Sequence, residues 1–160
     1  MILNGTEIIK LIGLSKTDRR VREFIKDRPI NDEYGVISVD FDDLGLELGF
    51  DDLTITDKQK AECIGGLYLN DICFYDNCNF FPFNISIEDN LKVVEEKMNL
   101  KANYIDIDEP EGLFWMYEEL GWFTIQFTDE RYERVDSIYI RPFENPEASE
   151  FKEIMKLIKK

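Results

Sequence analysis

The chain has 160 residues, of which 44% are hydrophobic and 13% aromatic, so it is long and apolar enough for one folded domain rather than a disordered chain. Its 19 basic and 34 acidic side chains give a formal net charge of −15. A field of that sign repels nucleic-acid phosphate and anionic lipid and attracts basic partners, so neither a nucleic-acid nor a membrane partner is expected.

The first 30 residues predict two helices. The first covers about residues 6–14 with Thr6 as its cap, and the second runs over about residues 17–27 with Thr17 as its cap. Apolar residues recur at helical spacing in both segments, and Pro29 stops the second. The outer side of the second helix is basic and is expected to be a solvated face, formed by Arg19, Arg20, Arg22 and Lys26.

Residues 36–50 change to the two-residue period of β-strands. Apolar residues alternate over 44–50, and residues 42–45 have the composition of a hairpin turn. Residues 57–62 are polar and predict a loop, and strand character resumes over 64–75. Antiparallel strands joined by tight connections are therefore expected here.

Ser86 and Asp89 match a helix capping box, and apolar residues at helical spacing follow, so a central helix is expected to begin at Ser86. Asn145 and Pro146 have the composition of a helix start, so a last helix is expected after them.

Three further strands are expected between these helices, at about 113–117, 121–127 and 134–141. Their short connections favour an antiparallel meander. In the third of them, Val135 and Ser137 are expected on one side, with Ile138 and Ile140 on the other.

The order of these elements favours the α+β class over parallel α/β. We expect a single domain over residues 1–160, with a mainly antiparallel sheet, two N-terminal helices, one central helix and one C-terminal helix. No segment reaches the roughly 20 apolar residues of a membrane span, and the first residues lack the basic lead and cleavage site of a signal peptide.

Cysteine and histidine usage limits the chemistry. Cys63, Cys73 and Cys78 form no compact framework and are expected to be free thiols, which suits the cytoplasm. The chain has no histidine, so Ser–His–Asp or Cys–His nucleophile pairs and His-containing zinc sites are excluded. We expect no metal, no cofactor and no enzymatic activity.

Two acidic segments are candidate sites. Residues 40–45 partly match the ligand spacing of an EF-hand loop, but their flanks predict strands and Asp51 stands where that loop needs Glu. A solvated turn or a weak cation site fits better. The carboxylates crowded into 106–111 could divide acid and base roles only in a cleft that raised the pKa of one of them. Otherwise they form a solvated or partner-facing loop.

A series of short motifs follows one another along the chain. They are a Gly-Leu-x-Leu-x-Phe strand at 45–50, an apolar strand ending beside an aromatic at 72–75, a Pro-Phe-x-apolar-Ser segment at 82–86, a strand with Trp115, and a closing strand with Val135, Ile138 and Ile140. Over roughly residues 34–141 this layout resembles the immunity proteins of bacterial polymorphic-toxin and contact-dependent inhibition systems. The resemblance implies a stoichiometric inhibitor that binds a cognate toxin in the cytoplasm.

We therefore expect an immunity-type protein that binds a basic toxin domain, with carboxylates steering the partner and aromatic residues anchoring it. Residues 31–149 hold 28 acidic side chains against 8 basic ones, which suits such a partner. Two other hypotheses stay open: an adaptor or regulatory protein-binding module, and a carboxylate- or cation-dependent hydrolase. The expected contact residues are Asp42, Asp43, Asp51, Asp52, Asp106, Asp108, Glu109 and Glu111.

Overall fold

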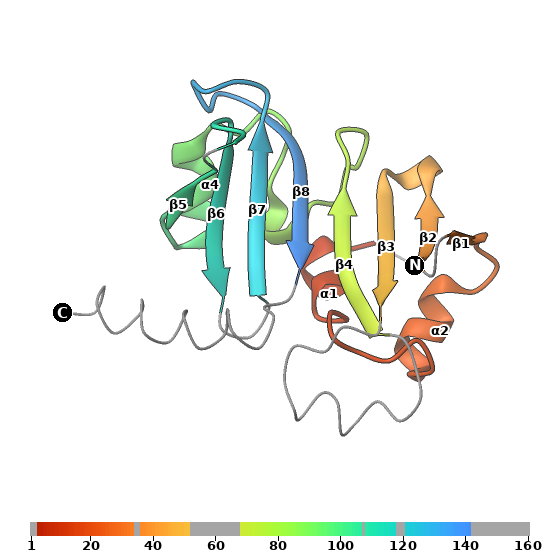
Figure 1. Ribbon diagram of the computed structural model, residues 1–160. Coiled ribbons are helices and arrows are strands. Elements are labelled where there is room, and N and C mark those ends of the chain that lie inside the picture. The colour runs from red at the N-terminus through yellow and green to blue at the C-terminus, as the bar shows by residue number, and fades with distance from the viewer. Residues whose placement is uncertain (1–2, 34–35, 52–67, 107, 118–120, 142–160) are drawn as a thin grey trace.

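The strands of the computed structural model form one antiparallel sheet in the order β1-β2-β3-β4-β8-β7-β6-β5 (Figure 1). The structure describes residues 3–33, 36–51, 68–106, 108–117 and 121–141. The α+β class and the antiparallel sheet are both confirmed. The strands are β1 (Ile30–Glu33), β2 (Val36–Phe41), β3 (Leu46–Asp51), β4 (Tyr68–Phe74), β5 (Tyr104–Ile105), β6 (Gly112–Tyr117), β7 (Gly121–Phe127) and β8 (Val135–Arg141).

Three α-helices and two short 3-10 turns lie within the described residues. The expected C-terminal helix, the expected loop at 57–62 and Cys63 lie outside them. The helices are α1 (Gly5–Ile9), α2 (Arg19–Ile25) and α4 (Leu91–Met98), and the turns are η1 (Asp42–Leu44) and η2 (Pro82–Asn84).

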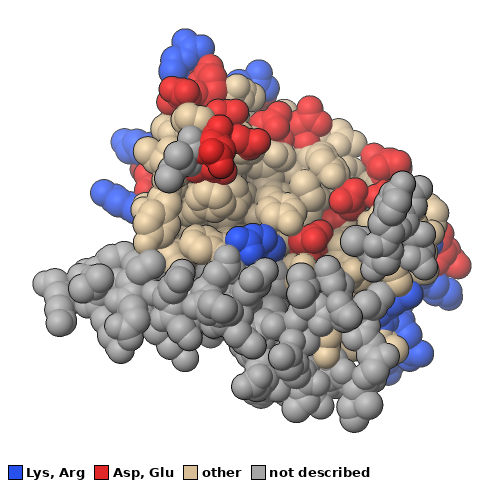
Figure 2. Space-filling model, in the orientation of Figure 1, with Lys and Arg blue, Asp and Glu red and all other residues tan. Residues whose placement is uncertain are grey.

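The helices pack on one face of the sheet and leave the other face open within the described residues (Figure 1). Alternate residues of the strands enter one continuous apolar core with residues of α1, α2 and α4. In β7, for example, Phe123 and Ile125 are fully buried, and Thr124 between them faces the opposite side. Figure 2 views the open face, where uncharged surface is bordered above by acidic side chains.

A register shift corrects the expected orientation of Val135. Phe127 pairs with Val135, whereas the preceding residue, Gln126, pairs with Ser137, so β8 carries one extra residue at this point. The bulge returns Val135, which is 2% exposed, to the core side that Ile138 and Ile140 also occupy.

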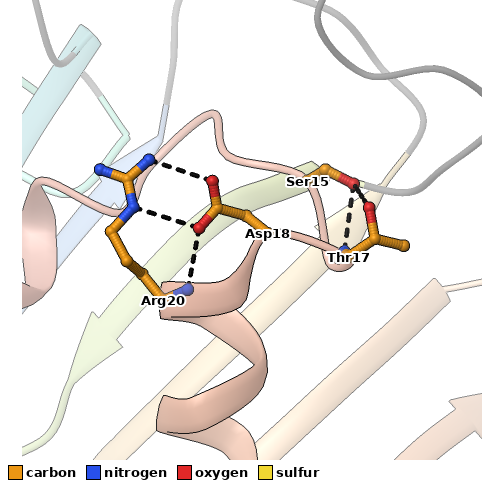
Figure 3. Close-up of polar contacts among 4 residues, drawn as sticks. All are labelled: Ser15, Thr17, Asp18 and Arg20. Carbon is orange, nitrogen blue, oxygen red and sulfur yellow. Dashed lines mark hydrogen bonds and ion pairs between the residues drawn. The ribbon is translucent and has the colours of Figure 1, made fainter.

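Helix α2 begins one residue later than expected. The Oδ1 atom of Asp18 accepts the backbone N–H of Arg20 at 2.9 Å, and the guanidinium of Arg20 contacts the other carboxylate oxygen at 3.0 Å (Figure 3). These hydrogen bonds lower the pKa of the Asp18 carboxyl. Thr17, the expected cap, instead contacts Ser15 (Figure 3).

Helix α4 also starts later than expected. Asp89 does accept the N–H of Ser86 at 2.8 Å, as a capping box requires, but the two residues close a turn before the helix. Asn90 is the cap, since its side chain accepts the N–H of Val93 at 3.0 Å.

Helix α1 is shorter than expected because the chain beyond it pairs with β4. The N–H of Gly13 donates to the carbonyl of Leu69, and the N–H of Leu69 donates to the carbonyl of Leu14, both at 2.8 Å. Asn4 caps α1, and Thr6 accepts the N–H of Phe83 instead.

Candidate functional site: the open face of the sheet

A single row of side chains crosses the open face from β2 to β5. Each member is the direct cross-strand partner of the next, so their side chains share one face of the sheet. The row changes from acidic to aromatic along its length. Its members are Asp40, Glu47, Cys73, Tyr139, Thr124, Phe114 and Tyr104.

Carboxylates gather at the β2–β4 end of this row. Glu47 lies opposite Asp40, and the carboxylate of Asp71 lies over Gly49, where a Cβ atom would be 2.2 Å from Asp71 Oδ1. Burial raises the pKa of the Glu47 carboxyl, and so do its hydrogen bond to Asp40 and the negative charges of Asp40 and Asp71. This end of the face can therefore hold a proton or attract a cation.

Two residues in the middle of the row stay uncharged at neutral pH. Burial raises the pKa of the Cys73 thiol to about 11 and that of the Tyr139 hydroxyl to about 12. Burial also raises the pKa of the neighbouring Tyr75 hydroxyl. Cys73 is thus a poor nucleophile here, because the thiolate is the reactive form.

The β6–β8 side of the face contains a hollow of about 550 Å³. Its walls combine aromatic rings with polar side chains, and acidic residues of the loop between β5 and β6 border it. The lining residues are Asp106, Glu109, Glu111, Phe114, Thr124, Gln126, Ser137, Tyr139 and Arg141.

Hydrogen bonds fix the shape of this acidic loop. Asp106 Oδ1 accepts the N–H groups of Asp108 and Glu109 at 3.0 and 3.3 Å. The N–H of Asp106 donates to the carbonyl of Gly112, and the N–H of Gly112 donates to the carbonyl of Glu109. These hydrogen bonds close the loop into a turn that carries the carboxylates.

Tryptophan occupies both sides of the sheet. Trp115 is a core residue, since it is fully buried, and it donates its indole N–H to the carbonyl of Leu100 at 3.0 Å. Trp122 lies on the open face, where the guanidinium of Arg141 stands 6.0 Å from its ring centroid.

Comparison with models of known protein families, with curated proteins and with solved structures gives no match. A function for this chain is therefore inferred from the geometry of the open face.

The eight expected contact residues fall into separate places. Of the carboxylates in 106–111, Asp106, Glu109 and Glu111 line the hollow, whereas Asp108 is exposed in the loop beside them. The other four expected contact residues belong to the β2–β3 hairpin or directly follow it, and none of those that the structure describes lines the hollow.

Asp42 and Asp43 lie in η1, the turn that connects β2 to β3, and Asp43 forms an ion pair with Arg28. Asp51 is the last residue of β3 and so lies at the end of the strand opposite to η1. The expected contact residues Asp42 and Asp43 therefore lie apart from Asp51, and Asp52 lies outside the described residues.

Sequence reasoning missed the acidic end of the open face. The Glu47 carboxyl at this end of the face has the raised pKa that acid–base chemistry needs. Asp40 lies in strand β2, so the flanks of the EF-hand-like segment are strands as expected. Among the residues that the structure describes, no group of three or more carboxylates and thiols is arranged to hold a metal ion.

The α-helices of the described ranges have five, seven and eight residues. None of them combines the length and the apolar character that crossing a bilayer requires.

Proposed function

We propose that this chain is a protein-binding domain that holds a basic partner on the open face of its sheet, and that it acts as an immunity-type inhibitor of a toxin domain. It binds stoichiometrically in the cytoplasm and has no catalytic turnover. The partner is held by contact rather than by reaction.

The observation that carries this proposal is the pairing of uncovered aromatic surface with carboxylates on one sheet face. Phe114 and Tyr139 border a hollow whose rim is acidic. Aromatic residues supply most of the energy at protein interfaces, and complementary charge speeds the encounter. An acidic surface of this kind matches the basic cleft of an enzyme that acts on nucleic acid.

Among protein-binding functions, the resemblance of the motif layout to immunity proteins favours an inhibitor. The last motif lies in β8, which contributes Tyr139 and Arg141 to the hollow. The motif with Trp115 lies in β6, which contributes Phe114. The motif residues Trp115, Val135, Ile138 and Ile140 are themselves buried in the core, and the strands that carry them present Phe114, Tyr139 and Arg141 on the open face.

The test begins with capture of the partner on immobilised protein from lysate of the source cells, followed by identification of what is retained. The retained protein is then expressed alone and together with this chain. We expect growth arrest in the first case and restored growth in the second. A retained protein that is harmless alone, or whose toxicity this chain does not relieve, contradicts the inhibitor function.

Charge reversal locates the surface. We expect E109K/E111K to slow association with the captured partner about tenfold or more at low salt, because steering depends on the local field. The matched control, E23K/E96K, makes the same change in net charge on helices of the covered face and should leave association nearly unchanged. Equal rates for the two variants would refute the open face as the binding surface.

A further inference from the structure

The hollow has an acidic end and a basic end. Cross-strand register arranges its floor in successive tiers, with Gln126 and Ser137 nearest the acidic loop, and Arg141, the cross-strand partner of Trp122, farthest from it. Tiers on one face are two residues apart, about 7 Å, so the two ends are separated by about 14 Å. The tier between them contains Phe114, Thr124 and Tyr139.

The carboxylates at the acidic end are available to a ligand. The side chains of Glu109 and Glu111 make no hydrogen bond or ion pair within the part of the chain that the structure describes. Asp43, by contrast, is already paired with Arg28. Three acidic side chains and one basic side chain line the hollow, which gives it a net charge of −2.

The middle tier suits the stem of a long cationic side chain. Phe114 and Tyr139 line the hollow from β6 and β8, and the Tyr139 hydroxyl stays protonated. Lysine and arginine side chains lay their methylene groups along apolar surface while the charged end reaches polar groups. The stacking of Arg141 near Trp122 shows that an aromatic ring of this face accommodates a guanidinium.

We propose that the hollow binds one arginine or lysine side chain of the partner, with the charged end between Glu109 and Glu111 and the stem against Phe114 and Tyr139. Arginine is preferred, since its planar guanidinium can contact a carboxylate through two hydrogen bonds and stack on a ring. That this side chain belongs to a protein partner rests on the proposed function. Binding of a cationic side chain in the hollow can be tested without that partner.

The probe is N-acetyl-arginine N-methylamide, titrated into the full chain and followed by nuclear magnetic resonance. We expect saturable shifts of the Trp122 indole N–H and the Gln126 side-chain amide, with little change at Trp115. The citrulline analogue has nearly the same shape without the charge and should bind about tenfold more weakly.

Paired variants test the carboxylates. E109Q/E111Q should raise the dissociation constant of the probe about fivefold to tenfold, the loss expected for two partly exposed charge contacts. The control E23Q/E96Q changes the net charge equally on the covered side and should leave it unchanged. Unchanged amide spectra outside the hollow would show that both variants remain folded.

The outcomes separate this inference from the proposed function. Absence of saturable shifts at Trp122 and Gln126, or equal binding of the citrulline analogue, overturns the cation site even if a protein partner binds elsewhere. Probe binding that E109Q/E111Q weakens supports the site, and it would do so even if capture yielded no toxin and the inhibitor function failed.

Discussion

Gly5, the first residue of α1, packs directly against the backbone that leads into η2. A Cβ atom at this position would lie 2.2 Å from the carbonyl oxygen of Phe80, 2.4 Å from the nitrogen of Pro82 and 2.6 Å from the carbonyl carbon of Phe81. Ordinary contact begins at 3.4 Å, and none of these atoms belongs to a flexible side chain. Gly5→Ala can therefore be accommodated only if α1 moves away by roughly 1 Å.

That displacement loosens the buried side of α1. Ile8 and Ile9 are 4% and 2% exposed, and full burial of each is worth about 1.5–3 kcal/mol. Loss of about half of that burial costs about 1.5–3 kcal/mol for the two side chains together, whereas the better helix propensity of alanine returns at most about 1 kcal/mol. We expect Gly5→Ala to lower the free energy of unfolding by about 2 kcal/mol.

Urea denaturation followed by far-ultraviolet circular dichroism measures this change. Arg22→Ala, at an exposed position of α2, is the control and should change stability by less than about 0.5 kcal/mol. A Gly5→Ala variant as stable as the wild type, or more stable, would show that helix propensity outweighs the contact between α1 and η2.

Three further predictions concern single side chains. Because the fold raises the pKa of Glu47, its contribution to stability is present below the ordinary value of 4.5 and is lost as pH rises through the folded value. Glu47→Gln should therefore gain stability relative to wild type as pH rises, in melting curves taken from pH 4 to 8. An unchanged difference across that range would contradict it. Asp89 is 12% exposed and contacts Lys97 at 2.6 Å, so Asp89→Ala should cost about 2 kcal/mol in urea denaturation, against under about 0.5 for the exposed Glu23→Ala. Trp115→Phe should cost about 2 kcal/mol by the same assay, the sum of one lost hydrogen bond and a small cavity, and a cost near zero would argue against its tight packing.

The strands with one apolar and one polar side were the most predictable elements. Strand β7 has the expected bounds, because burial alternates strictly along it and a shift of one residue would expose the core. Helix starts were displaced where two capping residues compete. Thr17 and Asp18 can both cap α2, and Asp18 prevails because its carboxylate also binds Arg20.

Two edge strands were missed for a different reason. Strand β1 has the sequence Ile-Asn-Asp-Glu, which lacks apolar alternation, and it is held by backbone pairing to β2. Strand β5 has two residues, both exposed. A strand that is held mainly by backbone hydrogen bonds to a neighbouring strand needs no alternation of apolar and polar residues in its own sequence.

The candidate site was predictable only where its residues are close in sequence. The carboxylates of 106–111 stand out as a run, and three of them line the hollow. Asp40 and Asp71 are 31 positions apart, and both come near Glu47 only through the register of β2, β3 and β4. The same strand pair contains a register shift between Gly49 and Phe50 that no local sequence pattern marks.

The pairing of β4 with β8 has a consequence for how the chain folds. Strands β1 to β4 and β5 to β8 are each neighbours in chain order, so each half can form through short-range contacts. Ile140 pairs with Phe123 across 17 positions but with Ile72 across 68. Closing the longer loop costs about 1.2 kcal/mol more in chain entropy. We therefore expect the two halves to form first and the seam between them to close last, so that the row of side chains crossing the open face is completed in the final step of folding.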